Sequence, residues 1–185
     1  MSDLGRVVRV LVEEGVRFIL VGGMAGIAHG SARLTEDLDV VYARDPENIK
    51  LLATALAPFH PYPRGAPPGL PFQWDAETIR RGLNFTLTTD LGWVDILGEI
   101  AGGGSYEQLV SESRSVRLFG IDCLCLNLDS LIRTKRAAGR PKDFEAIAEL
   151  EALWEERDQL GNGAERQPHQ HPRPVWQGGS KGQSD

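Results

Sequence analysis

The chain of 185 residues has little cysteine and no long apolar run. Its two cysteines, Cys123 and Cys125, would share one face of a strand, where they are poorly placed for a disulfide. A lone C-x-C pair does not complete a zinc site either, so we expect both cysteines to be packing residues. No segment has the length and apolarity of a membrane span, and the first residues show no signal-peptide pattern. We therefore expect a cytoplasmic protein without a membrane partner.

Positive charge is also scarce in this chain. Lys and Arg number 20 against 26 Asp and Glu, which gives a net charge of −6. This balance argues against a strongly basic surface that coats nucleic acid, although it leaves room for a local basic patch. The densest basic stretch, residues 133–142, has two interpretations: a contact with RNA phosphates, or a solvated helix end where cations favour the helix dipole.

Length and composition indicate one domain followed by a tail. A hydrophobic fraction of 41% is ordinary for a globular protein, and 1–157 is long enough to bury a sizeable core. Past Asp158 the chain is rich in Gly, Pro, Gln, His and Ser and has few aliphatic residues. Such a composition cannot bury enough apolar surface to offset the entropy of ordering. We therefore predict a disordered tail over 158–185.

Helical and strand periodicities both occur in the first 157 residues. They predict helices over 3–14, 24–29, 45–56, 76–81, 106–110, 129–138 and 141–157, and strands over 18–21, 37–42, 83–89, 93–97, 115–119 and 121–126. The Pro- and Gly-rich segment from Pro58 to Pro71 interrupts this pattern and predicts a loop. Aromatic residues of this loop either pack on the sheet edge or form part of an acceptor pocket.

The first candidate for chemistry is the glycine pair Gly22 and Gly23, which follows a buried strand and precedes a short helix. Paired glycines let the backbone approach a ligand closely, and the helix N-terminus offers N–H groups and partial positive charge to a phosphate. Strand–glycine–helix turns are also common in proteins that bind no phosphate. The pair alone therefore does not decide between a phosphate site and an ordinary turn.

The second candidate is a set of three carboxylates. Asp37 and Asp39 lie two residues apart on one strand, so their side chains point to the same face of the sheet. Asp95 lies at the centre of the apolar run Trp93–Leu97, where an aspartate is costly unless another group balances its charge. Three carboxylates that meet repel one another unless cations lie between them, and oxygen ligands suit Mg²⁺. The alternative is two half-exposed strands whose aspartates face water.

Together these residues carry a family resemblance. The segments Val21–Gly23, Arg33–Val40 and Val94–Ile96 resemble the minimal nucleotidyltransferase domain of the DNA polymerase β superfamily. The Arg-x-Thr that precedes Asp-x-Asp, with Lys135 and the later 139–143, resembles the branch of AbiEii-like toxins. The resemblance covers about residues 5 to 155. It implies an α+β fold, a mixed β-sheet flanked by helices with further helices at the C-terminal end.

The resemblance also implies roles for individual residues. Gly22 and Gly23 would cradle the triphosphate of an NTP, while Asp37, Asp39 and Asp95 would hold two Mg²⁺ ions, or Mn²⁺ in their place. Asp95 would lie nearest the attacking hydroxyl and accept its proton. One position departs from the pattern, because many members place a serine where this chain has Gly23.

Two basic residues are further candidates for phosphate binding. Arg33 lies in the turn before the acidic strand and is a planar donor, although a solvated turn arginine is the alternative. Lys135 lies within a predicted helix, where it either neutralises the β- and γ-phosphates or remains a surface lysine.

The expected activity is transfer of a nucleoside monophosphate from an NTP to an acceptor hydroxyl. For a toxin-like enzyme the acceptor would be tRNA or a protein, and a cognate antitoxin would be the partner. Two alternatives stay open: an enzyme that modifies an antibiotic or another small molecule, and a catalytically silent module that binds nucleotide.

Overall fold

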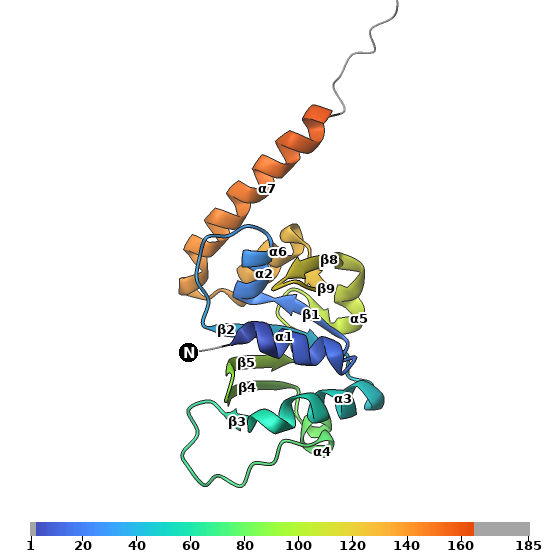
Figure 1. Ribbon diagram of the computed structural model, residues 1–185. Coiled ribbons are helices and arrows are strands. Elements are labelled where there is room, and N and C mark those ends of the chain that lie inside the picture. Colours follow the sequence, from blue (N-terminus) through green and yellow to red (C-terminus); the bar gives the residue numbers. More distant parts are fainter. Residues whose placement is uncertain (1–2, 165–185) are drawn as a thin grey trace, which may run out of the picture.

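The computed structural model describes residues 3–164, which form a mixed seven-stranded sheet with helices packed around it (Figure 1). The helices are α1 (Leu4–Glu13), α2 (Gly22–Ala28), α3 (Pro46–Leu56), α4 (Ala76–Arg81), α5 (Tyr106–Leu109), α6 (Leu128–Ala138) and α7 (Phe144–Ala164), with 3₁₀ turns η1 (Ala57–Phe59), η2 (Val110–Glu112) and η3 (Pro141–Asp143). The sheet contains β1 (Phe18–Val21), β2 (Asp37–Tyr42), β3 (Tyr62–Pro63), β4 (Asn84–Thr89), β5 (Gly92–Leu97), β8 (Ser113–Leu118) and β9 (Ile121–Leu126), and a separate small hairpin contains β6 (Glu99–Ile100) and β7 (Gly104–Ser105). The predicted fold class is confirmed.

The strand order is β3-β4-β5-β2-β1-β9-β8, in which two pairs are parallel. β2 pairs with β5 in parallel, and β1 pairs with β9 in parallel, whereas the remaining neighbours are antiparallel. The strands predicted over 83–89 and 93–97 are present as β4 and β5, which pair as an antiparallel hairpin. Parallel neighbours need a long connection, and the 49 residues between Tyr42 and Gly92 supply it with α3, β3, α4 and β4.

The central strands are buried because their sequence is almost continuously apolar. All four residues of β1 are buried, and Leu38, Val40 and Ile96 of the neighbouring strands are fully buried. Burial of this kind stabilises a fold by roughly 25 cal/mol for each Å² of apolar surface removed from water. β1 is therefore buried throughout, whereas β2 buries Leu38 and Val40, and β5 buries Val94 and Ile96, on one face and leave their aspartates only partly buried on the other.

The helices form two packed groups. α1 contacts α3, and α3 contacts α4, while α2 contacts α6 and α6 contacts α7. α1 begins after Asp3, whose side chain accepts a hydrogen bond from the Arg6 backbone N–H, and α3 begins after Asp45, which caps Asn48 in the same way. Pro46 occupies the first helical position of α3, where its missing N–H leaves no hydrogen bond unmade.

The last predicted helix differs from the structure. Pro141 opens a short 3₁₀ turn, and the α-helix begins only at Phe144 and continues to Ala164. Such turns are common at helix N-termini, where proline lacks the N–H that the helix would leave unpaired. The predicted domain boundary at residue 157 therefore falls within α7, which projects away from the sheet in Figure 1. The remainder of the predicted tail, 165–185, lies outside the described residues.

Both cysteines are buried and unoxidised, as the packing interpretation predicts. Burial is the main cause that raises the pKa of the Cys123 thiol to about 11 and that of Cys125 to about 12. Neither thiol is therefore a reactive thiolate near neutral pH. Within residues 3–164 no helix combines the length and apolarity that a membrane crossing requires.

Candidate active site

Three carboxylates meet where β2 and β5 run side by side. The parallel register places Asp39 directly opposite Asp95, and Asp37 lies one alternation earlier on β2. One carboxylate oxygen from each of the three residues lies within 4.8 Å of the others. The structure thus brings together the three aspartates that the sequence singles out, although Asp39 and Asp95 are 56 positions apart in the chain.

Alternation along the strands causes this convergence. Leu38 and Val40 are fully buried in the core, so Asp37 and Asp39 must point to the opposite face of the sheet. Val94 and Ile96 are also fully buried, and they orient Asp95 in the same way. All three aspartates are partly buried and gathered on this one face of the sheet.

The cluster is electrostatically strained, chiefly at Asp39. Burial, followed by the neighbouring charges of Asp37 and Asp95, raises the pKa of Asp39 to about 6. A hydrogen bond from the Gly23 backbone N–H and the more distant charge of Lys135 oppose this rise without cancelling it. An all-oxygen donor set of three carboxylates that repel one another fits a hard divalent cation such as Mg²⁺.

The glycine pair lies against this cluster. Gly22 begins α2 with φ +62°, and a Cβ built on it would lie 2.0 Å from Asp39 Oδ2. A Cβ on Gly23 would lie 2.5 Å from Thr35 Oγ1. Position 22 therefore requires glycine both for its backbone conformation and for the space that Asp39 takes.

Thr35 takes the space where a side chain at position 23 would lie. Its hydroxyl donates a hydrogen bond of 2.9 Å to Asp37 Oδ1, and it lies in the segment just before β2. The departure from the serine of the resembling family thus has a physical reason, because Thr35 and a serine at position 23 would collide. The sequence placed Thr35 in the Arg-x-Thr motif without giving it a role, and the structure shows its contacts with Asp37 and Gly23.

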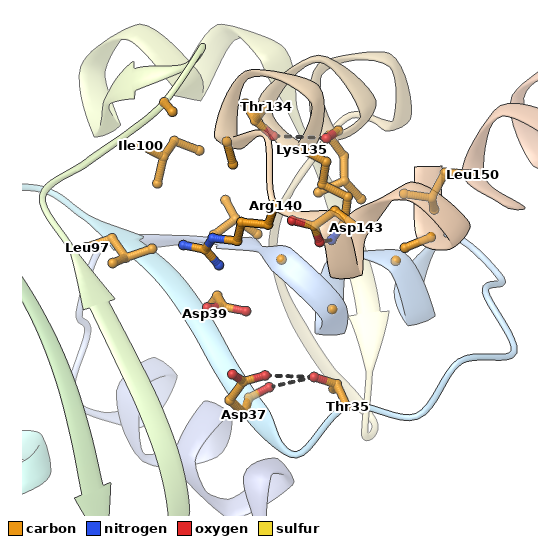
Figure 2. Close-up of a pocket in the computed structure, with 18 of the residues that line it drawn as sticks. Thr35, Asp37, Asp39, Leu97, Ile100, Thr134, Lys135, Arg140, Asp143 and Leu150 are labelled. Atoms are coloured by element: carbon orange, nitrogen blue, oxygen red, sulfur yellow. Dashed lines mark hydrogen bonds and ion pairs between the residues drawn. The ribbon is translucent and has the colours of Figure 1, made fainter. Parts of the chain in front are cut away.

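A cavity of about 340 Å³ opens beside the cluster (Figure 2). Asp37, Asp39 and Thr35 line its polar part, whereas Leu97 and Ile100 line an apolar part. α2, β2, α6, η3 and α7 all contribute lining residues. A cavity that is both polar and apolar can accommodate a ligand with an anionic end and a flat apolar end.

The predicted phosphate ligands Lys135 and Arg33 both line this cavity. Lys135 Nζ lies 3.2 Å from Asp143 Oδ1, and the two side chains are only 13% and 11% exposed. The surface-lysine interpretation therefore does not describe Lys135. Arg33 is more exposed and forms an ion pair of 3.2 Å with Glu145 of α7.

The basic stretch from residue 133 to 142 divides between the surface and the cavity. Arg133 pairs with Glu112 and Arg136 pairs with Glu151, both at the surface. Arg140 lines the cavity, and its side chain extends toward Asp39 and Leu97 in Figure 2. Arg140 therefore joins Lys135 as a cation directed at the site.

Sequence reasoning missed one cation that contacts the carboxylates directly. Arg64 Nη2 lies 2.6 Å from Asp95 Oδ1, and Arg64 Nη1 lies 3.9 Å from Asp37 Oδ2. Arg64 lies inside the segment predicted to be a loop, and its backbone N–H donates to Thr86 O of β4, which extends the pairing of β3. The surrounding prolines and glycines hide this short strand, so no periodicity pointed to Arg64.

Comparison by sequence gives no relative: no protein-family model matches the chain, and no curated protein matches it. Comparison by structure finds solved proteins of similar fold. A Thermotoga maritima protein provisionally assigned as a nucleotidyltransferase is 17% identical, with a TM-score of 0.51 over 86% of this chain and 91% of its own. The lincosamide adenylyltransferase LnuA, with lincomycin bound, is 14% identical, with a TM-score of 0.55 over 82% of this chain and 96% of its own. At these identities the likeness establishes the architecture, and the chain therefore has the nucleotidyltransferase fold.

Proposed function

We propose that this protein transfers a nucleoside monophosphate from an NTP to an acceptor hydroxyl with the help of divalent metal ions. The observation that carries the proposal is the convergence of Asp37, Asp39 and Asp95 beside a cavity that Asp37 and Asp39 line. Three clustered carboxylates repel one another, and the guanidinium of Arg64 contacts two of the three, Asp95 and Asp37, so the cluster beside a glycine turn supports a site for a further cation.

The three aspartates would hold Mg²⁺, with two ions as the expected number, and Mn²⁺ as a substitute. When bound, such ions neutralise triphosphate charge and favour ionisation of an attacking hydroxyl. Gly22 and Gly23 let the triphosphate approach the backbone closely. The base and sugar would then extend toward the apolar part of the cavity at Leu97.

The remaining residues position the reactants and take the proton. Lys135, Arg33 and Arg140 line the cavity and would pair with phosphate oxygens. The acceptor oxygen forms a bond to the α-phosphorus while the bond from that phosphorus to the bridging oxygen breaks. Pyrophosphate leaves with the electron pair of the broken bond, and Asp95 accepts the proton of the acceptor hydroxyl.

Lys135→Met is expected to raise the KM for the NTP about tenfold, because one charge-assisted contact to phosphate is worth about 1.4 kcal/mol or more. The measurement is steady-state kinetics with the NTP varied. Arg136→Met is the matched control, since it removes a cation from the same helix that pairs with Glu151 at the surface. An equal rise in KM for both variants would contradict a specific role for Lys135.

The pH dependence of metal binding provides a second test. Because the pKa of Asp39 is raised to about 6, its carboxyl is mostly protonated at pH 5 and mostly ionised at pH 7. Only the ionised form binds a metal ion well, so Mn²⁺ affinity should rise about tenfold from pH 5 to pH 7. Calorimetric titration at both values measures it, and a pH-independent affinity would contradict the assignment of Asp39 as a ligand.

The acceptor is proposed to be a macromolecule, tRNA or a protein, as in the AbiEii-like branch, with an antitoxin as the regulatory partner. A small-molecule acceptor is the second candidate. Two observations favour it: the cavity volume of about 340 Å³ is typical of small-molecule sites, and LnuA, an enzyme acting on lincosamides, has this fold.

Label transfer distinguishes these candidates. The wild type and the Asp37→Ala/Asp39→Ala variant are each incubated with Mg²⁺ and each of four α-labelled NTPs, together with total tRNA, cell protein, a panel of hydroxyl-bearing antibiotics, or buffer. Label on tRNA or protein from the wild type alone establishes the macromolecular acceptor and names the NTP. Label on an antibiotic establishes the small-molecule acceptor. No transfer to any of them, with NTP binding intact, would overturn the proposed activity.

A further inference from the structure

Arg64 occupies a position that a metal ion would also require. Its guanidinium contacts Asp95 at 2.6 Å and approaches Asp37 at 3.9 Å, so it lies between two of the three carboxylates. Trp93, two residues before Asp95 on β5, carries the guanidinium over its ring at 4.9 Å from the ring centroid. An arginine keeps its proton at all relevant pH values, so this is a permanent positive charge within the acidic cluster.

Arg64 has an ion pair and a ring contact, but one of its guanidinium donors lacks a hydrogen-bond partner in the part of the chain that the structure describes. Its side chain is 23% exposed, and its Nε is buried without a hydrogen-bond partner among the described residues. A buried donor left unpaired costs free energy, which offsets part of the gain from the ion pair with Asp95. Arg64 follows β3, a two-residue strand at the edge of the sheet, so only short pairing holds its backbone. The guanidinium is therefore held firmly enough to compete with other cations, but at a site from which it can be displaced.

We infer that Arg64 is an internal counter-cation that competes with divalent metal for Asp95 and Asp37, and thereby sets the metal affinity of the site. This inference rests on the proposed function, because it needs the three aspartates to bind metal. A metal ion and the guanidinium repel each other and contact the same carboxylates, so both cannot occupy the Asp95 side fully. Metal binding then displaces the guanidinium from Asp95. Arg64 acts through Asp95 and is therefore a positioning residue, not a catalytic one.

The test measures metal binding without nucleotide or transfer. Free Mn²⁺ is followed by electron paramagnetic resonance during titration of the full-length wild type and Arg64→Met. We expect Arg64→Met to bind Mn²⁺ about three- to tenfold more tightly, because one positive charge within a few ångströms is removed from a partly buried site. We also expect Arg64→Met to have a lower Tm than the wild type in EDTA and a larger rise in Tm on addition of Mn²⁺.

The controls separate competition from a merely structural role. Arg44→Met removes another half-buried arginine, which lies over the Tyr42 ring and donates to Gly82 O at the opposite end of β2. This variant should bind Mn²⁺ with wild-type affinity. Should Arg64→Met not fold, Arg64→Gln keeps an N–H donor toward Asp95 without the charge and carries the same expectation.

Each outcome has a distinct meaning. Tighter Mn²⁺ binding by the Arg64 variant, with Arg44→Met unchanged, supports the counter-cation. Unchanged or weaker binding, while the wild type does bind Mn²⁺, overturns it and leaves the proposed function standing. If neither protein binds Mn²⁺ at millimolar concentration, both the inference and the metal-dependent function fail, and label transfer then tests the activity separately.

Discussion

Asp39→Asn is expected to lower nucleoside monophosphate transfer by about 1,000-fold or more, because the amide cannot supply the negative charge with which Asp39 would hold a metal ion. The same substitution should stabilise the metal-free protein at pH 7. The folded-state pKa of Asp39 is about 6, above its ordinary value of 3.8, so the native state binds more protons than the unfolded state between these values. The contribution of Asp39 to stability is therefore lost as the pH rises from about 4 to 6.

The magnitude of this stabilisation is about 1 to 3 kcal/mol at pH 7, since asparagine carries no charge that the pocket must hold. Urea unfolding in EDTA at pH 4 and pH 7 measures it, and the advantage of Asp39→Asn should be present only at pH 7. Asp122→Asn is the matched control, because Asp122 is an exposed strand aspartate paired with Arg117 at 3.8 Å. If Asp39→Asn lowers both the transfer rate and the free energy of unfolding at pH 7, Asp39 has a structural role instead.

A carboxylate that lowers stability but is expected to serve activity also stands out in the sequence, and this made the candidate site recognisable. An aspartate between Val94 and Ile96 contradicts the apolar pattern of a buried strand, and so does the pair at 37 and 39 beside Leu38. A pattern broken at three places is informative because each break costs free energy that packing cannot recover. The bounds predicted for β1 and β2 are confirmed for the complementary reason, since their other residues are uniformly apolar.

Strand register and the contacts of irregular segments could not be predicted from local sequence patterns. Asp39 faces Asp95 because β2 and β5 pair in parallel with that register; no local signal states which distant strands pair, so only the family resemblance implied that Asp95 joins Asp37 and Asp39. Arg64 was missed because β3 contains only two residues, fewer than periodicity can detect. The role of Thr35 could not be predicted, although the residue belongs to the Arg-x-Thr motif, because it depends on the space left by Gly23 in another segment.

Gly22→Ala is expected to disrupt the site strongly, although it adds only one methyl group. The backbone at Gly22 has φ +62°, a conformation that costs an alanine about 1 kcal/mol or more. In addition, the new Cβ would lie 2.0 Å from Asp39 Oδ2, so the carboxylate must move out of the metal position or the turn must shift. We expect transfer to fall about 100-fold or more, with Mn²⁺ affinity reduced at least about tenfold.

The comparison that isolates the site effect is Gly15→Ala. Gly15 follows α1 with a similar φ of +73°, and a Cβ on it would meet nothing within 4 Å. Both variants therefore carry the backbone strain, but only Gly22→Ala pushes against Asp39. Equal losses of stability in urea, with transfer and Mn²⁺ binding reduced only in Gly22→Ala, would show that glycine at position 22 preserves the placement of a carboxylate. Equal transfer rates in the two variants would mean that Asp39 can relax without cost, and that the close approach of Gly22 has no part in the chemistry.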